Sequence, residues 1–428
     1  MPANASSFGL GVVSILLLSR AVSGMRVAII GGGVSGLSCA QGLKALGVDA
    51  TVFDTGKRDV GGRCSTRDSK SSADLVFEHS AQVMVARDEA FLKFCEDRVA
   101  AGELRHFGGG GIEAVTFDSA LAPSASVPIQ NDGRQLFVGT RGMQSLAGAL
   151  ASGLDLRRDV WVSGLSRKDA SGGWSVREAP GETFDAVVIA HNGKCADSLL
   201  NKTGGQSPRV HDLLKVSFGP SLRDPRATRK MQLCSLFVLA FAGPKDLLPG
   251  AATARIVEGH PVLSWACNTS KKLGLGAAVG AEHSYTLISS REYGANNKVP
   301  QEAIPPEKRA QVTSDMLRAA EALYGLPAGS ITPTFSCLQL WGAAVPLNRH
   351  SAPCVWDGAA RMGVCGDWFT PSAATRGPGI ESAFLSGRRC AEAVARGLRV
   401  SRPPNACQNN SALLTPLRPF PHTLSLPL

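Results

Sequence analysis

Short apolar runs separated by a longer helical pattern open the folded part of the chain. Val27–Ile30 has the length and branching of a buried parallel strand, and Ala50–Phe53 repeats this pattern. The segment between them, from about Val34 to Leu46, is predicted to form a helix. Strand, helix and strand in this order predict an α/β unit with a parallel sheet.

Similar runs predict further elements along the chain. Strands are expected over Val160–Leu165, Phe184–Ala190, Leu233–Phe241 and near residues 361–366, and helices over Pro305–Tyr324 and from Pro378 or Gly379 onward.

Three glycines follow the first strand directly, at Gly31, Gly33 and Gly36, in the spacing G-x-G-x-x-G. The first allows a tight turn, the second lets the backbone approach a pyrophosphate, and the third lets the helix pack closely on the strand. The free N–H groups at the start of that helix, from Val34 and Ser35, would face the diphosphate.

Asp54 ends the second strand, about twenty residues after the glycines, where a carboxylate accepts hydrogen bonds from ribose hydroxyls. Its negative charge would also repel a 2′-phosphate. Strand, glycines, helix and acid together predict a dinucleotide site. The alternative is a structural turn in an ordinary α/β sheet.

A second glycine pair follows at Gly61 and Gly62, with Arg63 and Arg67 after it. The glycines let the loop lie against a diphosphate, and the two guanidinium groups offer fork-shaped donors. The alternative is a solvated basic turn. The segment resembles the GGR motif of the FAD-dependent amine oxidase superfamily.

Residues 361–389 resemble the C-terminal flavin motif of the same superfamily, with a short strand that ends in Gly366 and Asp367. The resemblance implies that Asp367 binds the ribityl chain or the pyrophosphate. It also implies that a helix after Gly379, beginning near Ile380, directs its N-terminus at the flavin. Such a terminus stabilises negative charge on reduced flavin. Alternatively, Asp367 is only a loop residue.

Two further features bear on the cofactor. The strand over Val160–Leu165 resembles the one whose backbone meets adenine, which makes Val162 a candidate, with a plain core valine as the alternative. Cys64 lies in the GGR loop without the sequence context of a covalent flavin attachment. The predicted cofactor is therefore FAD, bound non-covalently.

Other segments resemble renalase-like FAD oxidoreductases, from about Met25 to about Leu398. They are Phe77–Gln82, Ala86–Asp88, Gly139–Leu146, Leu263–Ala266 and the surroundings of Trp341. The resemblance implies oxidation of isomeric reduced nicotinamide dinucleotides with oxygen as acceptor. Elsewhere the superfamily oxidises amines or desaturates polyenes. Departures such as Ser80, Val83 and Met84 lie in this cleft, and the segment Ala190–Ala196 resembles plant and algal relatives.

Catalytic side chains are not identified by the pattern, because hydride transfer to flavin requires no protein acid or base. His79 and Gln82 are candidates, since they are polar groups in an otherwise apolar segment. His79 could equally be a buried structural group, and Gln82 could bond the flavin's amide edge. Trp265 and Trp341 could line an aromatic wall or simply pack in the core. The sequence has no nucleophile elbow, which excludes hydrolase chemistry.

The length of 428 residues exceeds one usual core and predicts two interleaved domains. The expected fold is α/β, with a Rossmann-like FAD-binding domain and a substrate domain built on a mostly antiparallel sheet with helices covering one side. The boundaries are 25–85, 150–205 and 350–398 for the FAD-binding domain and 86–149 and 206–349 for the substrate domain, with a targeting peptide at 1–24 and a disordered tail at 399–428.

Charge and cysteine content narrow the partners. The net charge of +10 is dispersed without a basic run, which suits an anionic substrate or plain solubility and includes no nucleic-acid module. Eleven cysteines without a C-x-x-C pair indicate reduced thiols, with neither a disulfide framework nor a metal site. The expected partner is a small molecule, such as a reduced dinucleotide or an amine.

Phe8–Leu18 is apolar but too short to span a bilayer, and Ala21–Ser23 resembles a cleavage site. A cleaved targeting peptide for a plastid, mitochondrion or the secretory pathway is expected. If Met25 is the true start, the protein is cytoplasmic.

Four functions remain open from the sequence. They are an FAD-dependent oxidase, an amine oxidase or polyene desaturase with the same cofactor, a non-catalytic flavin-binding protein, and a nicotinamide dehydrogenase that shares only the first motif.

Overall fold

A computed structural model describes residues 24–68, 75–108, 111–129, 134–168, 172–191, 193–203, 205, 207–222, 230–245, 247–250, 252–275, 281–400 and 418–419. The predicted targeting peptide and most of the predicted tail lie outside these residues. Within them, no helix combines the length and the apolar character needed to cross a membrane.

The first sheet has six strands in the order β10-β2-β1-β13-β22-β21. Neighbouring strands are parallel except for the β21–β22 pair. Their bounds are β1 Arg26–Ile30, β2 Asp49–Phe53, β10 Asp155–Arg157, β13 Ala186–Ile189, β21 Val355–Asp357 and β22 Met362–Val364. The strands predicted over Val27–Ile30, Ala50–Phe53, Phe184–Ala190 and near 361–366 are thereby confirmed, as is the Rossmann-like α/β fold class.

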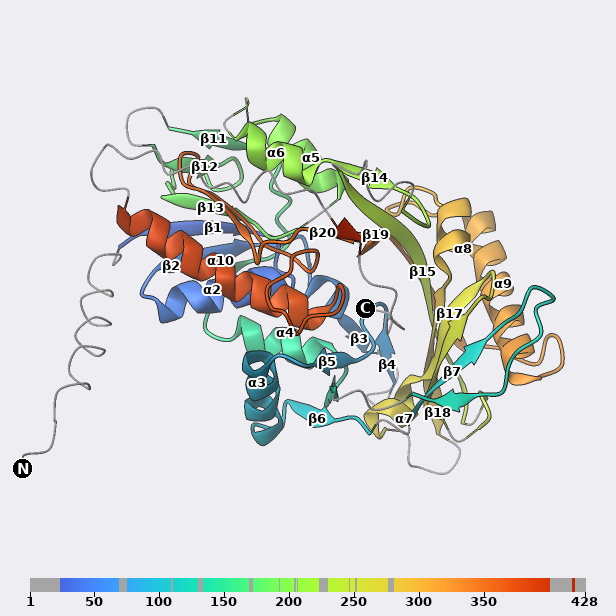
Figure 1. The fold of residues 1–428 in the computed structure, drawn as a ribbon. Coiled ribbons are helices and arrows are strands. Elements are labelled where there is room, and N and C mark those ends of the chain that lie inside the picture. The colour runs from blue at the N-terminus through green and yellow to red at the C-terminus, as the bar shows by residue number, and fades with distance from the viewer. Residues whose placement is uncertain are drawn as a thin grey trace, which may run out of the picture.

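Helix α2 (Val34–Ala45) and helix α10 (Ile380–Val400) pack against each other on one face of this sheet (Figure 1). Two glycines permit the close approach. A Cβ at Gly42 would lie 2.7 Å from the Cβ of Ala391, and one at Gly387 would lie 2.2 Å from the carbonyl oxygen of Ser35. The two predicted helices are confirmed, and their N-termini start from the same end of the sheet.

The second sheet is mostly antiparallel, as predicted. Its strands are β7 Ile112–Thr116, β8 Val127–Pro128, β14 Val216–Phe218, β15 Met231–Pro244, β16 Ala254–Glu258, β17 Leu263–Asn268, β18 Glu282–Ser289 and β19 Phe335–Pro346. Strand β15 is buried along almost its whole length because both faces of the sheet are covered. Leu233–Phe241 lies within it, as expected.

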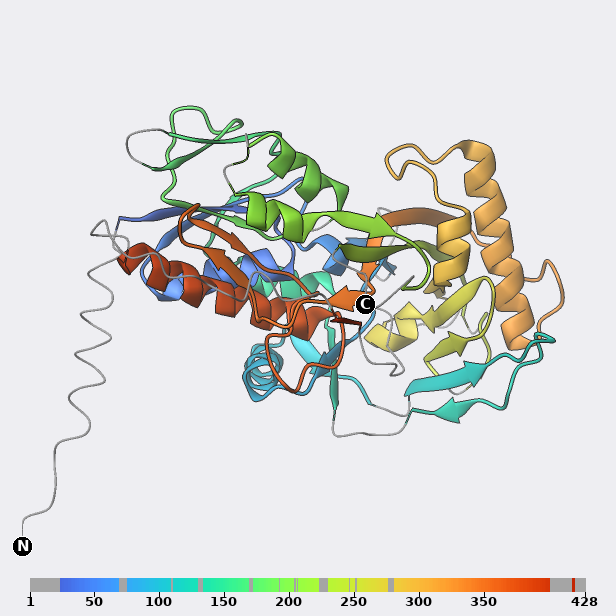
Figure 2. The same cartoon turned by 45° about the horizontal axis from the view of Figure 1, so that its top comes forward.

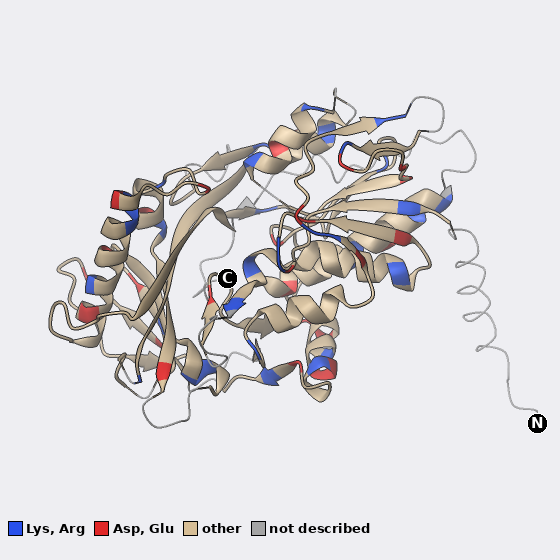
Figure 3. Cartoon of the chain, turned by 180° about the vertical axis from the view of Figure 1, so that it is seen from behind, with Lys and Arg blue, Asp and Glu red and all other residues tan. Residues whose placement is uncertain are grey.

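Helices α8 (Arg291–Asn296) and α9 (Pro306–Tyr324) lie on the outer side of this sheet, where Figure 2 shows α9 as the long orange helix. The helix predicted over Pro305–Tyr324 is confirmed. In the view of Figure 3, acidic and basic segments are interspersed over both parts of the molecule.

A smaller group of elements packs on α2 and α10. It comprises β5 Met84–Ala86, α3 Glu89–Ala100, β6 Leu104–His106, β9 Gln135–Gly139 and α4 Gln144–Ala151. Residues 86–149 therefore contribute to both halves, because β7 and β8 join the second sheet. The domain boundaries themselves stay a prediction.

The remaining elements are short. They are η1 Gly62–Cys64, β3 Thr66–Asp68, β4 Val76–Glu78, β11 Leu165–Arg167, β12 Trp174–Val176, α5 Lys194–Asn201, α6 Pro208–Leu214, α7 Thr269–Leu273, β20 Asn348–Arg349 and β23 Arg418–Pro419. β23 pairs with β20, so the described piece of the predicted disordered tail is a strand.

One predicted strand is wrong. Residues 160–164 form no strand, and β11 begins only at Leu165. Val160 donates its backbone N–H to the carbonyl oxygen of Asp54 at 2.9 Å, but the segment has no partner strand. Its apolar pattern reflects the cavity wall that Val160 and Val162 line, since Trp161 between them is 58% exposed.

Candidate functional site

A cavity of about 770 Å³ opens at the carboxyl ends of the parallel strands and extends to β19. All of the predicted cofactor-binding residues line it except Gly36 and Arg67. The lining residues among them are Gly31, Gly33, Val34, Ser35, Asp54, Gly62, Arg63, Val162, Gly366, Asp367, Gly379 and Ile380. Segments more than 300 residues apart thus meet in one cavity, although their binding role stays a prediction.

The glycine loop after β1 leaves open space over the N-terminus of α2. A Cβ added at Gly33 would meet no described atom within 4 Å, and Gly33 caps α2 without a side-chain hydrogen bond. Gly36 has a different role, because a Cβ there would lie 1.9 Å from the carbonyl oxygen of Gly31. The first N–H groups of α2 therefore face a cavity from which side chains are absent at Gly33.

Asp54 is held at the same end of the cavity by backbone donors. Its Oδ2 accepts from the N–H of Gly32 at 2.7 Å, and its Oδ1 accepts from that of Gly56 at 2.8 Å. The carboxylate is thereby fixed in orientation. Its remaining lone pairs are available for hydroxyl donors.

The second glycine loop lies directly against the first. The N–H of Gly61 donates to the carbonyl oxygen of Gly32 at 2.7 Å, and Gly33 and Gly61 form a β-bridge. Gly62 has a φ of +55°, a left-handed conformation that suits glycine. Both loops therefore border the N-terminus of α2.

Arg63 joins this loop to the C-terminal motif. Its Nη1 lies 2.9 Å from Oδ2 of Asp367 and 2.7 Å from the carbonyl oxygen of Ala344. Asp367 is only 3% exposed. Burial opposes the charged guanidinium, but Asp367 outweighs this effect and raises the pKa of Arg63. The two predicted motifs thus form one ion pair at the cavity wall.

An irregularity in β19 supplies the carbonyl that Arg63 uses. Cys234 pairs with Val345 and Leu236 pairs with Trp341, so residues 342–344 bulge opposite Ser235. The bulge frees carbonyl groups from the strand ladder and carries backbone into the cavity.

The start of α10 forms another part of the wall. Gly379 precedes the helix with a φ of +154°, and a Cβ there would meet no described atom within 4 Å. The acid in the first turn, Glu381, accepts from the N–H groups of Arg87 and Asp88 at 2.6 and 2.8 Å. The cavity therefore receives the positive ends of two helix dipoles.

The segment 78–82 supports the opposite wall. The N–H of Ala81 donates to the carbonyl oxygen of Arg63 at 2.9 Å, and the carbonyl oxygen of His79 accepts from Nε1 of Trp341 at 2.6 Å. Ala81, Arg63 and Trp341 all line the cavity. The position of this segment therefore affects two other parts of the wall.

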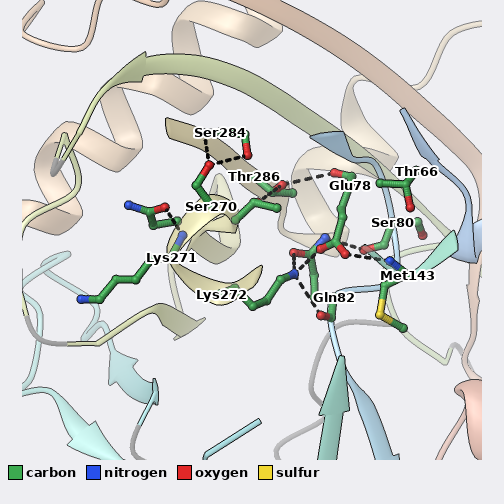
Figure 4. Close-up of polar contacts among 12 residues, drawn as sticks. Thr66, Glu78, Ser80, Gln82, Met143, Ser270, Lys271, Lys272, Ser284 and Thr286 are labelled. Atoms are coloured by element: carbon green, nitrogen blue, oxygen red, sulfur yellow. Dashed lines mark hydrogen bonds and ion pairs between the residues drawn. The ribbon is translucent and has the colours of Figure 1, made fainter. Parts of the chain in front are cut away.

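A buried cluster fixes both ends of that segment (Figure 4). Nζ of Lys272, in α7, pairs with Glu78 and donates to the carbonyl oxygen and Oε1 of Gln82 at 2.9 and 3.0 Å. The side chains of Lys272 and Glu78 are fully buried. Glu78 also accepts from the N–H of Met143 at 3.0 Å. Sequence reasoning missed Lys272, because nothing local marks it as a partner of Glu78.

The two catalytic candidates do not line the cavity. Both ends of the Gln82 amide are used, since Nε2 donates to the carbonyl oxygen of Ser80 at 2.9 Å and Oε1 binds Lys272. Nδ1 of His79 has no partner among the described residues. Burial lowers the pKa of His79 to about 4, which keeps the ring neutral near pH 7. Their catalytic roles stay predictions.

The other named residues are placed as follows. Trp341 lines the cavity, whereas Trp265 is fully buried in the core and lies outside the lining. Arg67, on β3, directs Nη1 to Sγ of Cys337 at 3.7 Å. Ten cysteines are described and all are free thiols, and no described group of acids, histidines and cysteines could hold a metal ion.

The outer part of the cavity holds a cationic group that sequence reasoning also missed. Nζ of Lys298 lies 3.5 Å from the ring centroid of Phe218, and Nζ of Lys194 lies 5.7 Å from it. Lys298 also donates to the carbonyl oxygen of Gly342 at 3.2 Å. Lys194 falls in the segment Ala190–Ala196, but Lys298 lies in a loop that carries no motif.

Comparisons with known proteins agree with this geometry. Residues 29–97 match the model of an NAD(P)-binding Rossmann-like domain. The structure of putrescine oxidase bound to putrescine is similar at 12% identity over 86% of this chain and 98% of that chain, with a TM-score of 0.53. Cyclohexylamine oxidase from Brevibacterium oxydans IH-35A is similar at 13% identity over 87% and 99%, with a TM-score of 0.55.

Reduced UDP-galactopyranose mutase is similar at 12% identity, with coverage of 92% and 96% and a TM-score of 0.59. At these identities the likeness shows the fold. The chain therefore shares its fold over most of its length with these proteins, and its first 70 or so described residues form a dinucleotide-binding Rossmann unit.

Proposed function

We propose that the protein is an FAD-dependent oxidase. It takes a hydride from a reduced small molecule of dinucleotide-like character and passes the electrons to oxygen. The convergence of two helix N-termini, two glycine loops and the Arg63–Asp367 pair on one cavity carries this proposal.

The described residues fit non-covalent FAD. The open space at Gly33 beside the start of α2 would hold the diphosphate, with Gly62 against it. Asp54 would accept from ribose hydroxyls, and Val162 would lie near the adenine. Asp367 and the start of α10 would meet the ribityl chain and the flavin ring.

Bound flavin supplies the hydride acceptor, so the chain's own residues have to orient the substrate and exclude water. The segment 78–82 and Trp341 form an apolar wall fixed by hydrogen bonds. No protein base is assigned, since His79 is neutral and lies outside the cavity lining. The sequence resemblance to renalase-like oxidoreductases supports a reduced nicotinamide dinucleotide as the substrate class.

An amine oxidase is the second candidate. Similarity to the structures of putrescine oxidase and cyclohexylamine oxidase over most of the chain favours it. The two candidates need the same cofactor and differ in the charge of the substrate, because an aliphatic amine is a cation at neutral pH and a dinucleotide is an anion.

The test is anaerobic mixing of the purified protein with reduced nicotinamide dinucleotides, their isomers and aliphatic amines, followed by absorbance near ~450 nm, where flavins absorb. Bleaching by a dinucleotide, reversed on admitting air, is the expected result. Bleaching by amines alone would select the second candidate. A yellow protein that none of them bleaches would contradict both and favour a non-catalytic flavin-binding role.

A further inference from the structure

The cavity extends past the residues assigned to FAD and ends at a cationic mouth. Lys194, Lys298 and Phe218 all line it there. Lys194 is the first residue of α5, and Lys298 follows α8, so the two ammonium groups come from opposite halves of the molecule. Both lie within 6 Å of the same aromatic ring.

These two charges are not neutralised by the part of the chain that the structure describes. Neither lysine forms an ion pair with a described carboxylate, although Glu302 lines the same cavity. Burial and the nearby Lys194 lower the pKa of Lys298. A position that places two like charges together is unfavourable unless an anion offsets it.

Arg63 provides the contrast. It bonds the carbonyl of Ala344 and Lys298 bonds that of Gly342, two residues along the same bulge of β19. The charge of Arg63 is committed to the buried carboxylate of Asp367, whereas the two lysines have only a carbonyl and an aromatic face. The unmet positive charge of the cavity therefore lies at its mouth and not beside the start of α2.

We propose that Lys194 and Lys298 form the anion subsite for the substrate, so that the substrate carries a phosphate or carboxylate group. This proposal rests on the proposed function and deepens it. Phe218 lies beneath both ammonium groups and offers a flat apolar face to the part of the substrate that bears the anion. The same two charges repel a cationic amine and thus act as a specificity determinant against it.

The anion has two possible sources, because the diphosphate of FAD and an acidic group of the substrate share the same chemistry. The substrate is favoured, since the glycine loops and the start of α2 already surround the place for the diphosphate. Measuring FAD retention and substrate binding separately distinguishes the two sources.

The experiment uses the purified holoenzyme and the variants Lys194→Gln, Lys298→Gln and both together. Lys93→Gln is the matched control, because Lys93 is an exposed lysine on α3 outside the cavity lining. Calorimetry measures the binding of inorganic pyrophosphate, and the FAD-to-protein ratio and thermal midpoint are recorded for each variant. Both test lysines are exposed, so all variants should fold.

Each single change should weaken pyrophosphate binding roughly three- to tenfold, and the double change more, with FAD content unchanged. The control should bind like the original protein. Equal binding by all variants, or no binding by the original, would overturn the subsite. Loss of FAD from the lysine variants would also overturn it, by assigning the lysines to the cofactor.

A turnover arm keeps this proposal separate from the proposed function. Reduced nicotinamide mononucleotide and neutral N-benzyl-dihydronicotinamide carry the same ring with and without an anion. The lysine variants should raise KM for the first and leave that for the second unchanged. A colourless original protein would refute the proposed function, whereas equal effects on both compounds would refute the subsite alone.

Discussion

Replacement of Gly33 by valine should remove FAD from the protein and leave the fold intact. Gly33 has a φ of −74° and a ψ of 177°, an extended conformation that valine adopts without strain. A Cβ there meets no described atom within 4 Å. The change in stability without cofactor should therefore stay within about 1 kcal/mol.

The cost falls on the cofactor. The valine side chain would occupy the space assigned to the diphosphate, and overpacking of this kind costs about 1–3 kcal/mol. Displacing the diphosphate from the start of α2 adds up to about 2 kcal/mol. Together these terms weaken FAD binding by roughly two to three orders of magnitude or more.

The assay measures the FAD-to-protein ratio after gel filtration and the thermal midpoint of the apoprotein. Gly36→Ala is the contrasting variant, because a Cβ there would lie 1.9 Å from the carbonyl oxygen of Gly31 and should destabilise the fold itself. Stoichiometric FAD in the Gly33 variant, or an apoprotein that unfolds as readily as Gly36→Ala, would refute the reasoning.

Three other changes follow from the contacts. Asp367→Ala should weaken FAD binding by about 1.5–3 kcal/mol, the usual contribution of a hydrogen bond to a charged group, measured by cofactor titration of the apoprotein; unchanged affinity would remove Asp367 from the site. Lys272→Met should destabilise the fold by about 3–5 kcal/mol by leaving Glu78 buried without its partner, and adding Glu78→Leu should recover part of this loss in denaturant unfolding; equal losses would argue against the pair. Stability should also fall with pH because the pKa of His79 is lowered to about 4, so that the unfolded chain binds a proton first; the loss accumulates from about pH 6.5 down to about pH 4, amounts to roughly 3 kcal/mol, and should be absent in His79→Phe.

Local patterns made the first part of the fold predictable. The strand Val27–Ile30, the glycines and the helix that follows depend on contacts within 40 residues, and the structure has them as expected. The meeting of Arg63 with Asp367 spans 304 residues, and it was expected through the resemblance of two motifs and not through any local rule.

Features that depend on distant packing could not be read from the chain. Lys272 pairs with Glu78 across 194 residues, and Lys298 reaches Gly342 only because β19 bulges. The predicted strand at Val160–Leu165 failed for a related reason. Its apolar residues serve a cavity wall, which produces the same alternation as a half-buried strand.

The central claim is that this cavity holds FAD, and the composition of the purified protein tests it most directly. The absorption spectrum and the mass of the cofactor released by denaturation should identify FAD at about one per chain, freed without breaking a covalent bond. A colourless protein that retains a nicotinamide dinucleotide, or no nucleotide even after incubation with FAD, would contradict the account.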